Sequence, residues 1–331
     1  MAPRPSVSVI MPVLNEERLL RPCLDAVGAQ PYEEIAEIIV ADGGSTDGTR
    51  ELAESYPKVR VVDNPRGNRP AGLNVAIAEA RGDIIVRVDA RTRIEPDYVC
   101  CCVEALTESD AAIVGGPMRY LAETPRQRGI AAAMLSRVGA GPAAFRRLGG
   151  EPRYVDTVYL GAFRTEVIDR LGGYDEWSGG NEDAELAFRA QGAGGVYLDP
   201  RIRSVYVVRE GLRPLARQFF RYGRNRARTV RKHPASLSVR QLVVPALAVG
   251  LVSPWRRPVL LAYLAVILGR TALEAVRDPA AAPVMMAALP TMHVSWGAGF
   301  VRGIIGPVAR TASKRPSPGE ETGPPRAESA P

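Results

Sequence analysis

Histidine and cysteine are scarce in this sequence. Its 331 residues contain four cysteines and two histidines, His233 and His293. Three of the cysteines are adjacent at 100–102, and no pair of Cys or His residues has the spacing of a zinc site. This scarcity argues against a structural zinc site. We interpret the cysteines as small apolar residues of a helix in a reducing compartment.

Two common sequence signals are also missing. The Gly-x-Gly-x-x-Gly fingerprint does not follow the first predicted strand, which argues against a dehydrogenase. The segment 1–6 is short and polar, and the apolar run after it lacks the length of a signal peptide. We therefore expect the N-terminal domain to stay in the cytoplasm.

Acidic residues are rare in one part of the chain only. Residues 1–200 contain 22 Lys and Arg against 30 Asp and Glu, whereas residues 201–310 contain 18 against 3. This asymmetry predicts an acidic soluble domain followed by a basic segment that meets an anionic surface. With an acidic N-terminal domain, that surface is expected to be membrane lipid and not nucleic acid.

Apolar runs alternate with helical patterns in the first hundred residues, which predicts an α/β fold with a mostly parallel sheet. Two of the predicted strands end on a carboxylate, Asp42 and Asp89. Ligands of such sheets bind at the carboxyl ends of the strands, so these acids indicate a polar ligand such as a nucleotide. The strands are predicted at 7–14, 37–42, 59–63 and 84–88.

Five segments together resemble the family 2 glycosyltransferases, inverting enzymes of the GT-A fold that use nucleotide-activated sugars. They are SVIMPVLNEE at 8–17, IIVADGGSTDGT at 38–49, RPAGLN at 69–74, the strand that ends at Asp89, and GNEDAELAFR at 180–189. The chain is most similar to the membrane-associated glucosyltransferases of succinoglycan-type exopolysaccharide assembly. In those enzymes an Arg precedes the Asp by two residues, as Arg87 does here.

The resemblance implies a pocket for the nucleoside of a nucleotide-sugar donor, a UDP-sugar in the first place. Asp42 would accept a hydrogen bond from the base edge, because an ionised acceptor makes a short, charge-assisted bond. Pro12, Asn15 and Glu16 would shape the pocket. The alternative for Asp42 is a structural one, in which it caps the next helix together with Ser45.

The resemblance also implies a site for the sugar diphosphate. Arg69 would bind phosphate oxygens, with a solvated loop arginine as its alternative. Asp89 matches the first acid of the Asp-x-Asp motif, which contacts the ribose and helps to place Mg²⁺ or Mn²⁺. Arg91 stands at the third position, and a guanidinium has donors only and cannot ligate a cation. A metal on Asp89 and a metal-free site in which Arg91 neutralises the diphosphate both stay open.

Asp183 corresponds to the general base of the family. It would take the proton of an acceptor hydroxyl as that oxygen attacks the anomeric carbon, so that the sugar is transferred with inversion in one displacement. The resemblance also implies that Glu182 lies beside the acceptor and the diphosphate. Glu182 and Glu185 can also be read as acids that favour the first turn of a helix.

The segment 209–240 allows two interpretations that are compatible. Gln218, Arg221 and Tyr222 resemble the Gln-x-x-Arg-Trp motif of related synthases, in which the segment covers the active site near the diphosphate and the acceptor sugar. The many arginines around them also predict a basic helix at the membrane interface.

Three apolar stretches follow at about 241–253, 258–269 and 279–301. Only the third is long enough to span a bilayer, and the first two have the length of re-entrant or interfacial segments. The positive charge before residue 241 puts that side in the cytoplasm. The predicted organisation is a catalytic domain at 1–208, a basic segment at 209–240, membrane-associated helices at 241–310 and a disordered tail at 311–331.

These features predict an enzyme that moves a hexose from a nucleotide-diphosphate sugar to a lipid-linked or exopolysaccharide acceptor at the cell membrane. One alternative is a catalytically silent scaffold that binds sugar nucleotides and lost its metal site through Arg91. Another is a polyprenyl-phosphate sugar synthase, whose phosphate acceptor is already ionised and needs no base.

Overall fold

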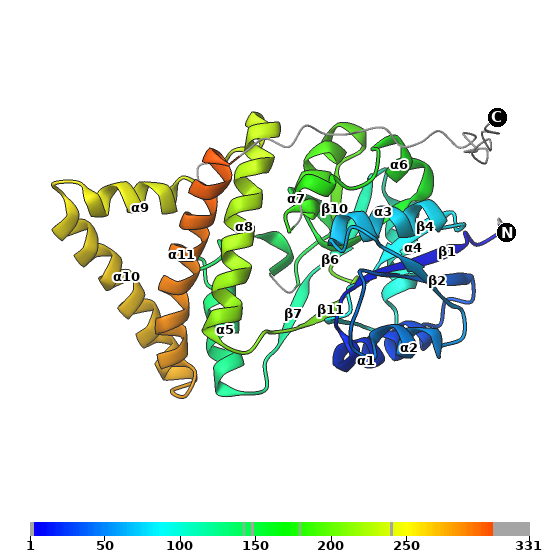
Figure 1. Ribbon diagram of the computed structural model, residues 1–331, viewed down its shortest axis with the longest axis horizontal. Coiled ribbons are helices and arrows are strands. Elements are labelled where there is room, and N and C mark those ends of the chain that lie inside the picture. The colour runs from blue at the N-terminus through cyan, green and yellow to red at the C-terminus, as the bar shows by residue number, and fades with distance from the viewer. Residues whose placement is uncertain (1–2, 142, 147–148, 179, 239–240, 307–331) are drawn as a thin grey trace, which may run out of the picture.

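The computed structural model describes residues 3–141, 143–146, 149–178, 180–238 and 241–306. The tail predicted at 311–331 lies outside these residues. Figure 1 shows a part rich in strands, which contains the N-terminus, and a group of long helices at the other side.

The first half of the chain forms parallel β/α units, as predicted. Strand β1 lies between β2 and β4, and β3 pairs with the outer edge of β2, all in parallel. These elements are β1 (Val7–Val13), α1 (Glu17–Gly28), β2 (Ile35–Asp42), α2 (Thr49–Glu54), β3 (Val59–Asp63), α3 (Arg69–Glu79) and β4 (Ile84–Arg87).

The sheet continues beyond β4 with strands of both directions. Among the described residues its order is β3-β2-β1-β4-β9-β6-β10-β8, with β9 antiparallel to both β4 and β6. A small second sheet has the order β5-β11-β7. The added strands are β5 (Thr92–Ile94), β6 (Ile113–Gly116), β7 (Met118–Leu121), β8 (Arg153–Val155), β9 (Tyr159–Arg164), β10 (Val196–Leu198) and β11 (Ser204–Val207).

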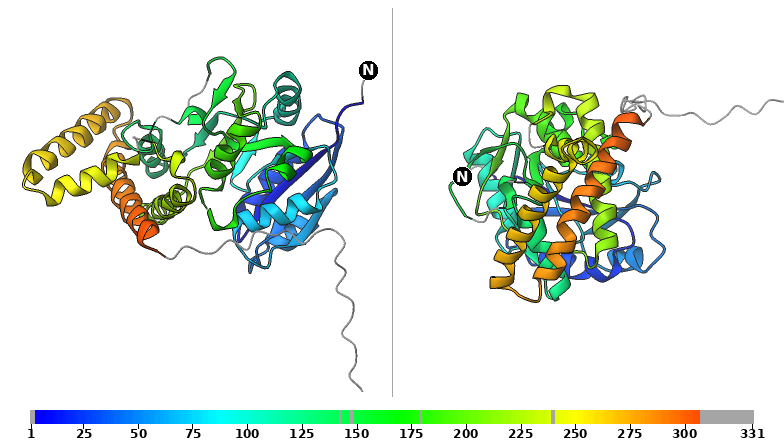
Figure 2. Two further views of the ribbon diagram at one scale, coloured as in Figure 1. Left: turned by 90° about the horizontal axis from the view of Figure 1, so that it is seen from above. Right: turned by 90° about the vertical axis from the view of Figure 1, so that its left-hand side faces the viewer.

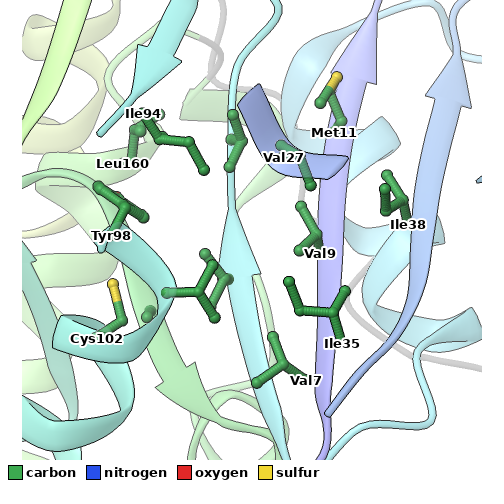
Figure 3. Packing of buried hydrophobic residues seen from close by; sticks show 14 of the residues in the cluster. Val7, Val9, Met11, Val27, Ile35, Ile38, Ile94, Tyr98, Cys102 and Leu160 are labelled. Atoms are coloured by element: carbon green, nitrogen blue, oxygen red, sulfur yellow. The ribbon is translucent and has the colours of Figure 1, made fainter. Parts of the chain in front are cut away.

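Apolar side chains cover both faces of the large sheet, which explains the continuous apolar runs of its strands. On one face Val7, Val9 and Met11 of β1 pack with Val27 of α1 and Cys102 of the helix α4 (Tyr98–Glu108), as Figure 3 shows. The opposite face is covered by α3, α6 (Thr165–Arg170) and α7 (Glu182–Ala190). The carboxyl ends of β1 and β4 are thereby held at a common edge.

The C-terminal part is helical and more extensive than predicted. It comprises α8 (Leu212–Lys232), α9 (Val243–Val252), α10 (Arg256–Arg277) and α11 (Ala282–Ile305). The stretch predicted at 258–269 is therefore part of a 22-residue helix. Arg270 and Glu274 form the expected i,i+4 pair at 3.1 Å, and the helix continues through both residues to Arg277. In the described residues α10 and α11 are long and apolar enough to cross a membrane.

Helix α8 lies between α11 and the sheet, and α8 and α11 run side by side (Figures 1 and 2). Glycines allow this close contact. A Cβ atom on Gly223 of α8 would clash with the carbonyl oxygen of Trp296, and one on Gly299 of α11 would clash with that of Phe220. At each of these points the backbone of one helix therefore reaches the backbone of the other because the facing residue is a glycine without a side chain.

We expect Gly299→Ala to lower the free energy of unfolding by about 1–3 kcal/mol, because the added methyl group must push α8 and α11 apart. Denaturant unfolding of the purified protein measures this loss. Gly269→Ala on α10 is the matched control, since a Cβ there has no other heavy atom within 4 Å. Equal stability of the two variants would contradict the close contact.

Candidate active site

A cavity of about 1430 Å³ opens at the carboxyl ends of β1 and β4. It is large enough for a nucleotide sugar together with part of an acceptor. Its polar end is lined by residues of the N-terminal domain and its apolar end by α9, α10 and α11. Ten of the predicted site residues line it: Pro12, Glu16, Arg69, Asp89, Arg91, Glu182, Asp183, Gln218, Arg221 and Tyr222.

Arg87 is the centre of the polar end. It is the last residue of β4 and its side chain is 1% exposed. Its guanidinium binds both oxygens of Asp89, at 2.9 Å from Nε and 3.2 Å from Nη2. From Nη1 it also donates a hydrogen bond to Oδ1 of Asp183, at the start of α7. One buried cation therefore joins the donor-site acid to the predicted base.

Arg69 and Glu182 extend this network. Nη1 of Arg69, the first residue of α3, lies 3.0 Å from Oε1 of Glu182 and 3.6 Å from Oδ2 of Asp89. The side chain of Asn68 begins α3 by accepting a hydrogen bond from the amide of Ala71 at 3.0 Å, which places Arg69 at the cavity. The network contains three carboxylates and two guanidiniums.

The network shifts the pKa values of its two aspartates in opposite directions. Burial raises the pKa of Asp183 to about 6, because its effect exceeds the opposing effect of Arg87, and the nearby carboxylates of Glu182 and Asp89 add to the rise. Burial also disfavours the charged form of Asp89, but Arg87 and Arg69 hold the pKa of that carboxyl below its ordinary value. Asp183 is thus the acid whose protonation changes near neutral pH.

The described side chains around Asp89 do not by themselves form a donor set for a divalent cation. Among the described residues, no group of three or more His, Cys, Asp or Glu side chains is arranged to hold a metal ion. Both oxygens of Asp89 are bound by Arg87, and Arg91 donates from Nε to Oε1 of Glu16 at 2.9 Å. Cationic groups occupy the positions where a metal site would need acceptors.

Asp42 and Asn15 lie beside the cavity and are outside its lining. Asp42 accepts hydrogen bonds from the hydroxyl of Ser45 at 2.6 Å and from its amide at 3.2 Å. Oδ1 of Asn15 accepts from the amide of Thr46 at 2.8 Å. Both side chains therefore organise the loop 43–49. The pairing of Asp42 with Ser45 is present, but Asp42 does not cap α2, whose N-cap is Gly48 without a side-chain hydrogen bond. Contact of Asp42 and Asn15 with a nucleoside stays a prediction.

Helix α8 brings its predicted residues to the cavity. Nε2 of the buried Gln218 donates to the hydroxyl of Tyr222 at 2.7 Å. Partial burial, with Arg209 and Arg69 nearby, lowers the pKa of Arg221. Positive charge is therefore concentrated between α8 and the network around Arg87, where an anionic ligand is stabilised.

Two contributors were missed as functional residues in the sequence. Arg87 was noted only as a subgroup marker, although a charge that ends an apolar strand indicates a buried ion pair. Arg209 follows β11 and was not singled out, and its Nε is buried without a hydrogen-bond partner. No sequence signal identified the aromatic ring of Tyr174, which lies 5.5 Å from the Arg87 guanidinium.

Comparison with known proteins assigns this arrangement to a family. The pattern described as Glycosyl transferase family 2 matches residues 8–168. Over 313 residues the chain is 33% identical to the succinoglycan biosynthesis protein ExoA of Rhizobium meliloti (strain 1021). The aligned region covers 90% of this chain and 94% of that protein. The chain belongs to glycosyltransferase family 2. The predicted family and the predicted enzyme class, a glycosyltransferase, are confirmed.

Other family 2 relatives and solved structures agree. A dolichyl N-acetyl-α-D-glucosaminyl phosphate 3-β-D-2,3-diacetamido-2,3-dideoxy-β-D-glucuronosyltransferase of Methanococcus voltae is 26% identical over 241 residues, 68% of this chain and 74% of that protein. The mannosyltransferase PcManGT of Pyrobaculum calidifontis, solved with GDP-Man and Mn²⁺, superposes with a TM-score of 0.58 at 23% identity. The superposition covers 92% of this chain and 88% of that chain. The predicted GT-A fold is confirmed.

Arg87→Met should destabilise this family 2 enzyme by about 3–5 kcal/mol, because Asp89 and Asp183 would lose their shared buried cation. Denaturant unfolding at pH 7 measures the change. Arg203→Met is the matched control, since Arg203 pairs at 3.5 Å with Asp97 on the surface, where both side chains are about half exposed. A loss at Arg87 no larger than that at Arg203 would contradict the central role of this guanidinium.

Proposed function

We propose that the enzyme transfers a hexose from a nucleotide-diphosphate sugar, a UDP-sugar in the first place, to a lipid-linked or polysaccharide acceptor with inversion. The observation that carries this proposal is the shared guanidinium of Arg87, which holds Asp89 and Asp183 at one end of the cavity. A donor acid and a base beside it suit a single displacement, which needs one base and no covalent intermediate.

In this reaction Asp183 accepts the proton of an acceptor hydroxyl. The hydroxyl oxygen bonds to the anomeric carbon as the bond from that carbon to the diphosphate oxygen breaks, and the nucleoside diphosphate leaves with the electron pair. Arg69, Arg91 and Arg221 line the same cavity and are the groups we assign to the negative charge of the departing diphosphate. The ion pair with Glu182 keeps Arg69 in place.

The far end of the cavity supports an acceptor that is presented at a membrane. It is lined by apolar residues of α9, α10 and α11, which include Val244, Leu247, Val259, Val266 and Trp296. The relative in Methanococcus voltae is named for a dolichyl phosphate substrate, and the relative in Rhizobium meliloti for succinoglycan biosynthesis. An apolar surface next to the transfer site is what a lipid-linked acceptor requires.

Two other functions make different demands on Asp183. A silent scaffold would bind nucleotide sugars without any turnover, and the intact set of Asp89, Asp183 and their guanidinium speaks against it. A polyprenyl-phosphate sugar synthase would use an acceptor oxygen that is already ionised. Such an enzyme would not depend on a base.

Asp183→Asn should abolish transfer and leave donor affinity within a few-fold, because the amide cannot accept the proton but keeps the shape of the side chain. Wild-type turnover should fall about tenfold per pH unit below the Asp183 pKa of about 6 and be constant above it, since only the ionised form acts as base. Turnover is measured with UDP-glucose and GDP-mannose as trial donors, and donor affinity by thermal shift.

Asp110→Asn is the control for this experiment, because Asp110 is an exposed acid that does not line the cavity. It should turn over like the wild type. Transfer by the Asp183→Asn protein at the wild-type rate would refute the base, and with a phosphate acceptor it would favour the polyprenyl-phosphate alternative. A wild-type protein that binds donors but never turns over would favour the scaffold.

Activity should persist in excess EDTA, because arginines take the place of metal ligands around Asp89. Under the same conditions Arg91→Gln should lower donor affinity, with thermal shift by the nucleoside diphosphate as the readout. Arg217→Gln is its control, an exposed arginine of α8 away from the cavity lining. Strict dependence of turnover on Mn²⁺ or Mg²⁺ would overturn this assignment.

A further inference from the structure

Two helices of the described chain pass the length and composition requirements of a membrane span, but they differ in their surroundings. The most apolar window of α10 is 6% buried, whereas that of α11 is 39% buried. The residues that bury α11 belong mainly to α8 and to α5 of the catalytic domain. This raises the question of whether either helix can cross a bilayer in this fold.

Helix α11 is attached to the catalytic part along its whole length. Near its start, Gly129 of α5 (Pro125–Leu135) packs directly against the backbone of Ala281 and Met285. In the middle, Nε2 of His293 lies 2.8 Å from the carbonyl oxygen of Val138. At its end, Arg231 of α8 donates to the carbonyl of Gly303 at 3.0 Å. No stretch of α11 as long as a bilayer is free of these contacts.

Helix α8 would have to enter the bilayer with α11. It contains eight Lys and Arg residues and no acid among its 21 residues. Its other side is bound to the catalytic domain, where Thr229 accepts from Asn181 at 2.8 Å and Lys232 lies 3.0 Å from Asp175. Placing so many cations and this polar interface in hydrocarbon is prohibitively costly. Helix α11 therefore lies outside the hydrocarbon core.

Helix α10 is also held at the same body at several points. After its C-terminal end, Asp278 binds Nε of Arg128 of α5 at 2.6 Å, and nearer its start Tyr263 bonds to His293 of α11 at 3.0 Å. Its N-terminal end is connected to α8 through α9, whose ten residues extend about 15 Å. A bilayer core is about 30 Å thick, so α9 by itself is too short to cross it.

The free surface of α9 and α10 is nevertheless strongly apolar. Its exposed large side chains are Val243, Val249, Val252, Leu260, Leu261, Leu264, Val266, Leu268, Leu273 and Val276. Trp255, which is 72% exposed, precedes α10, and the cations Arg256 and Arg257 are the first two residues of that helix. Aromatic and cationic residues at the border of an apolar surface are typical of contact with the headgroups of anionic lipids.

We propose that α9 and α10 dock the enzyme on one leaflet of an anionic membrane, and that none of the described helices crosses it. The apolar side chains of α9 and α10 lie in the acyl region, and Trp255, Arg256 and Arg257 lie among the headgroups. The catalytic domain and both ends of α10 and α11 are then on one side. The apolar end of the cavity, which these helices line, opens toward that leaflet.

The sidedness test uses Ala280→Cys, in the exposed turn between α10 and α11, and Ala29→Cys, on the exposed surface of the catalytic domain. Cells that express each full-length variant are treated with a membrane-impermeant maleimide before and after permeabilisation. The unsubstituted chain, with three buried cysteines and the half-buried Cys100, is the blank. We expect positions 280 and 29 to be labelled under the same condition.

A pair of spanning helices would put positions 280 and 29 on opposite sides of the membrane. Labelling of position 280 in intact cells, with position 29 protected until permeabilisation, would therefore overturn the proposal. Labelling of both positions under one condition supports it. Neither readout needs turnover, so a failure of the proposed reaction is distinguishable from a failure of this topology.

The lipid contact has its own test. Leu261→Glu combined with Leu268→Glu puts two charges on the exposed face of α10, and at least a tenfold loss from the membrane fraction is expected. Leu135→Glu, at a side chain 48% exposed at the end of α5, is the matched control and should stay with the membrane. Retention of the α10 variant to the same extent as the control would refute the lipid-facing surface. Binding to phosphatidylglycerol vesicles repeats the comparison with purified protein.

Discussion

The ion pairs of Arg87 connect parts of the site that are far apart in the sequence. Its guanidinium binds Asp89, two residues on, and Asp183, 96 residues on. A buried cation is stable only when it is surrounded by acceptors, so β4 and α7 must keep this arrangement for the fold to keep Arg87 inside. The same bonds that stabilise the protein therefore fix the distance between Asp89 and Asp183.

This network carries one more negative than positive charge, with Asp89, Glu182 and Asp183 against Arg69 and Arg87. Because Arg69 is already paired within the network, the proposed binding of a diphosphate needs further cations besides it. Arg221, Arg209 and other arginines at the border of the network provide them, since α8 contains no acid. In the proposed reaction, the sheet edge thus supplies the base and the helix that covers it supplies the counter-charge.

Much of this arrangement could be predicted from the sequence because it depends on local pattern. Apolar runs that end on Asp42 and Asp89 predicted parallel strands with acids at one edge, and family motifs led to Asp183. For Asp42 the sequence left two partners open, because a carboxylate looks the same whether Ser45 or a ligand satisfies it. Arg87 binds Asp89 and Asp183 at once, and its bond to Asp183 is a contact across 96 residues, which no local pattern contains.

The apolar helices show a second limit of sequence patterns. Hydropathy records that a helix avoids water but not what replaces the water, so α10 and α11 look alike in sequence. In the fold, the small residues Gly299 and Gly303 receive the backbone of α8, whereas the leucines of α10 face outward. Lipid and protein partners are distinguished only by this three-dimensional context.

The cavity is completed by Met292 and Trp296 of α11, more than a hundred residues after Asp183. During synthesis the β/α units leave the ribosome first, and domains generally fold in that order. The acids at the sheet edge are consequently in place before the wall that faces them exists. In the proposed topology, the helices that complete the cavity are therefore also the helices that carry the lipid-facing surface.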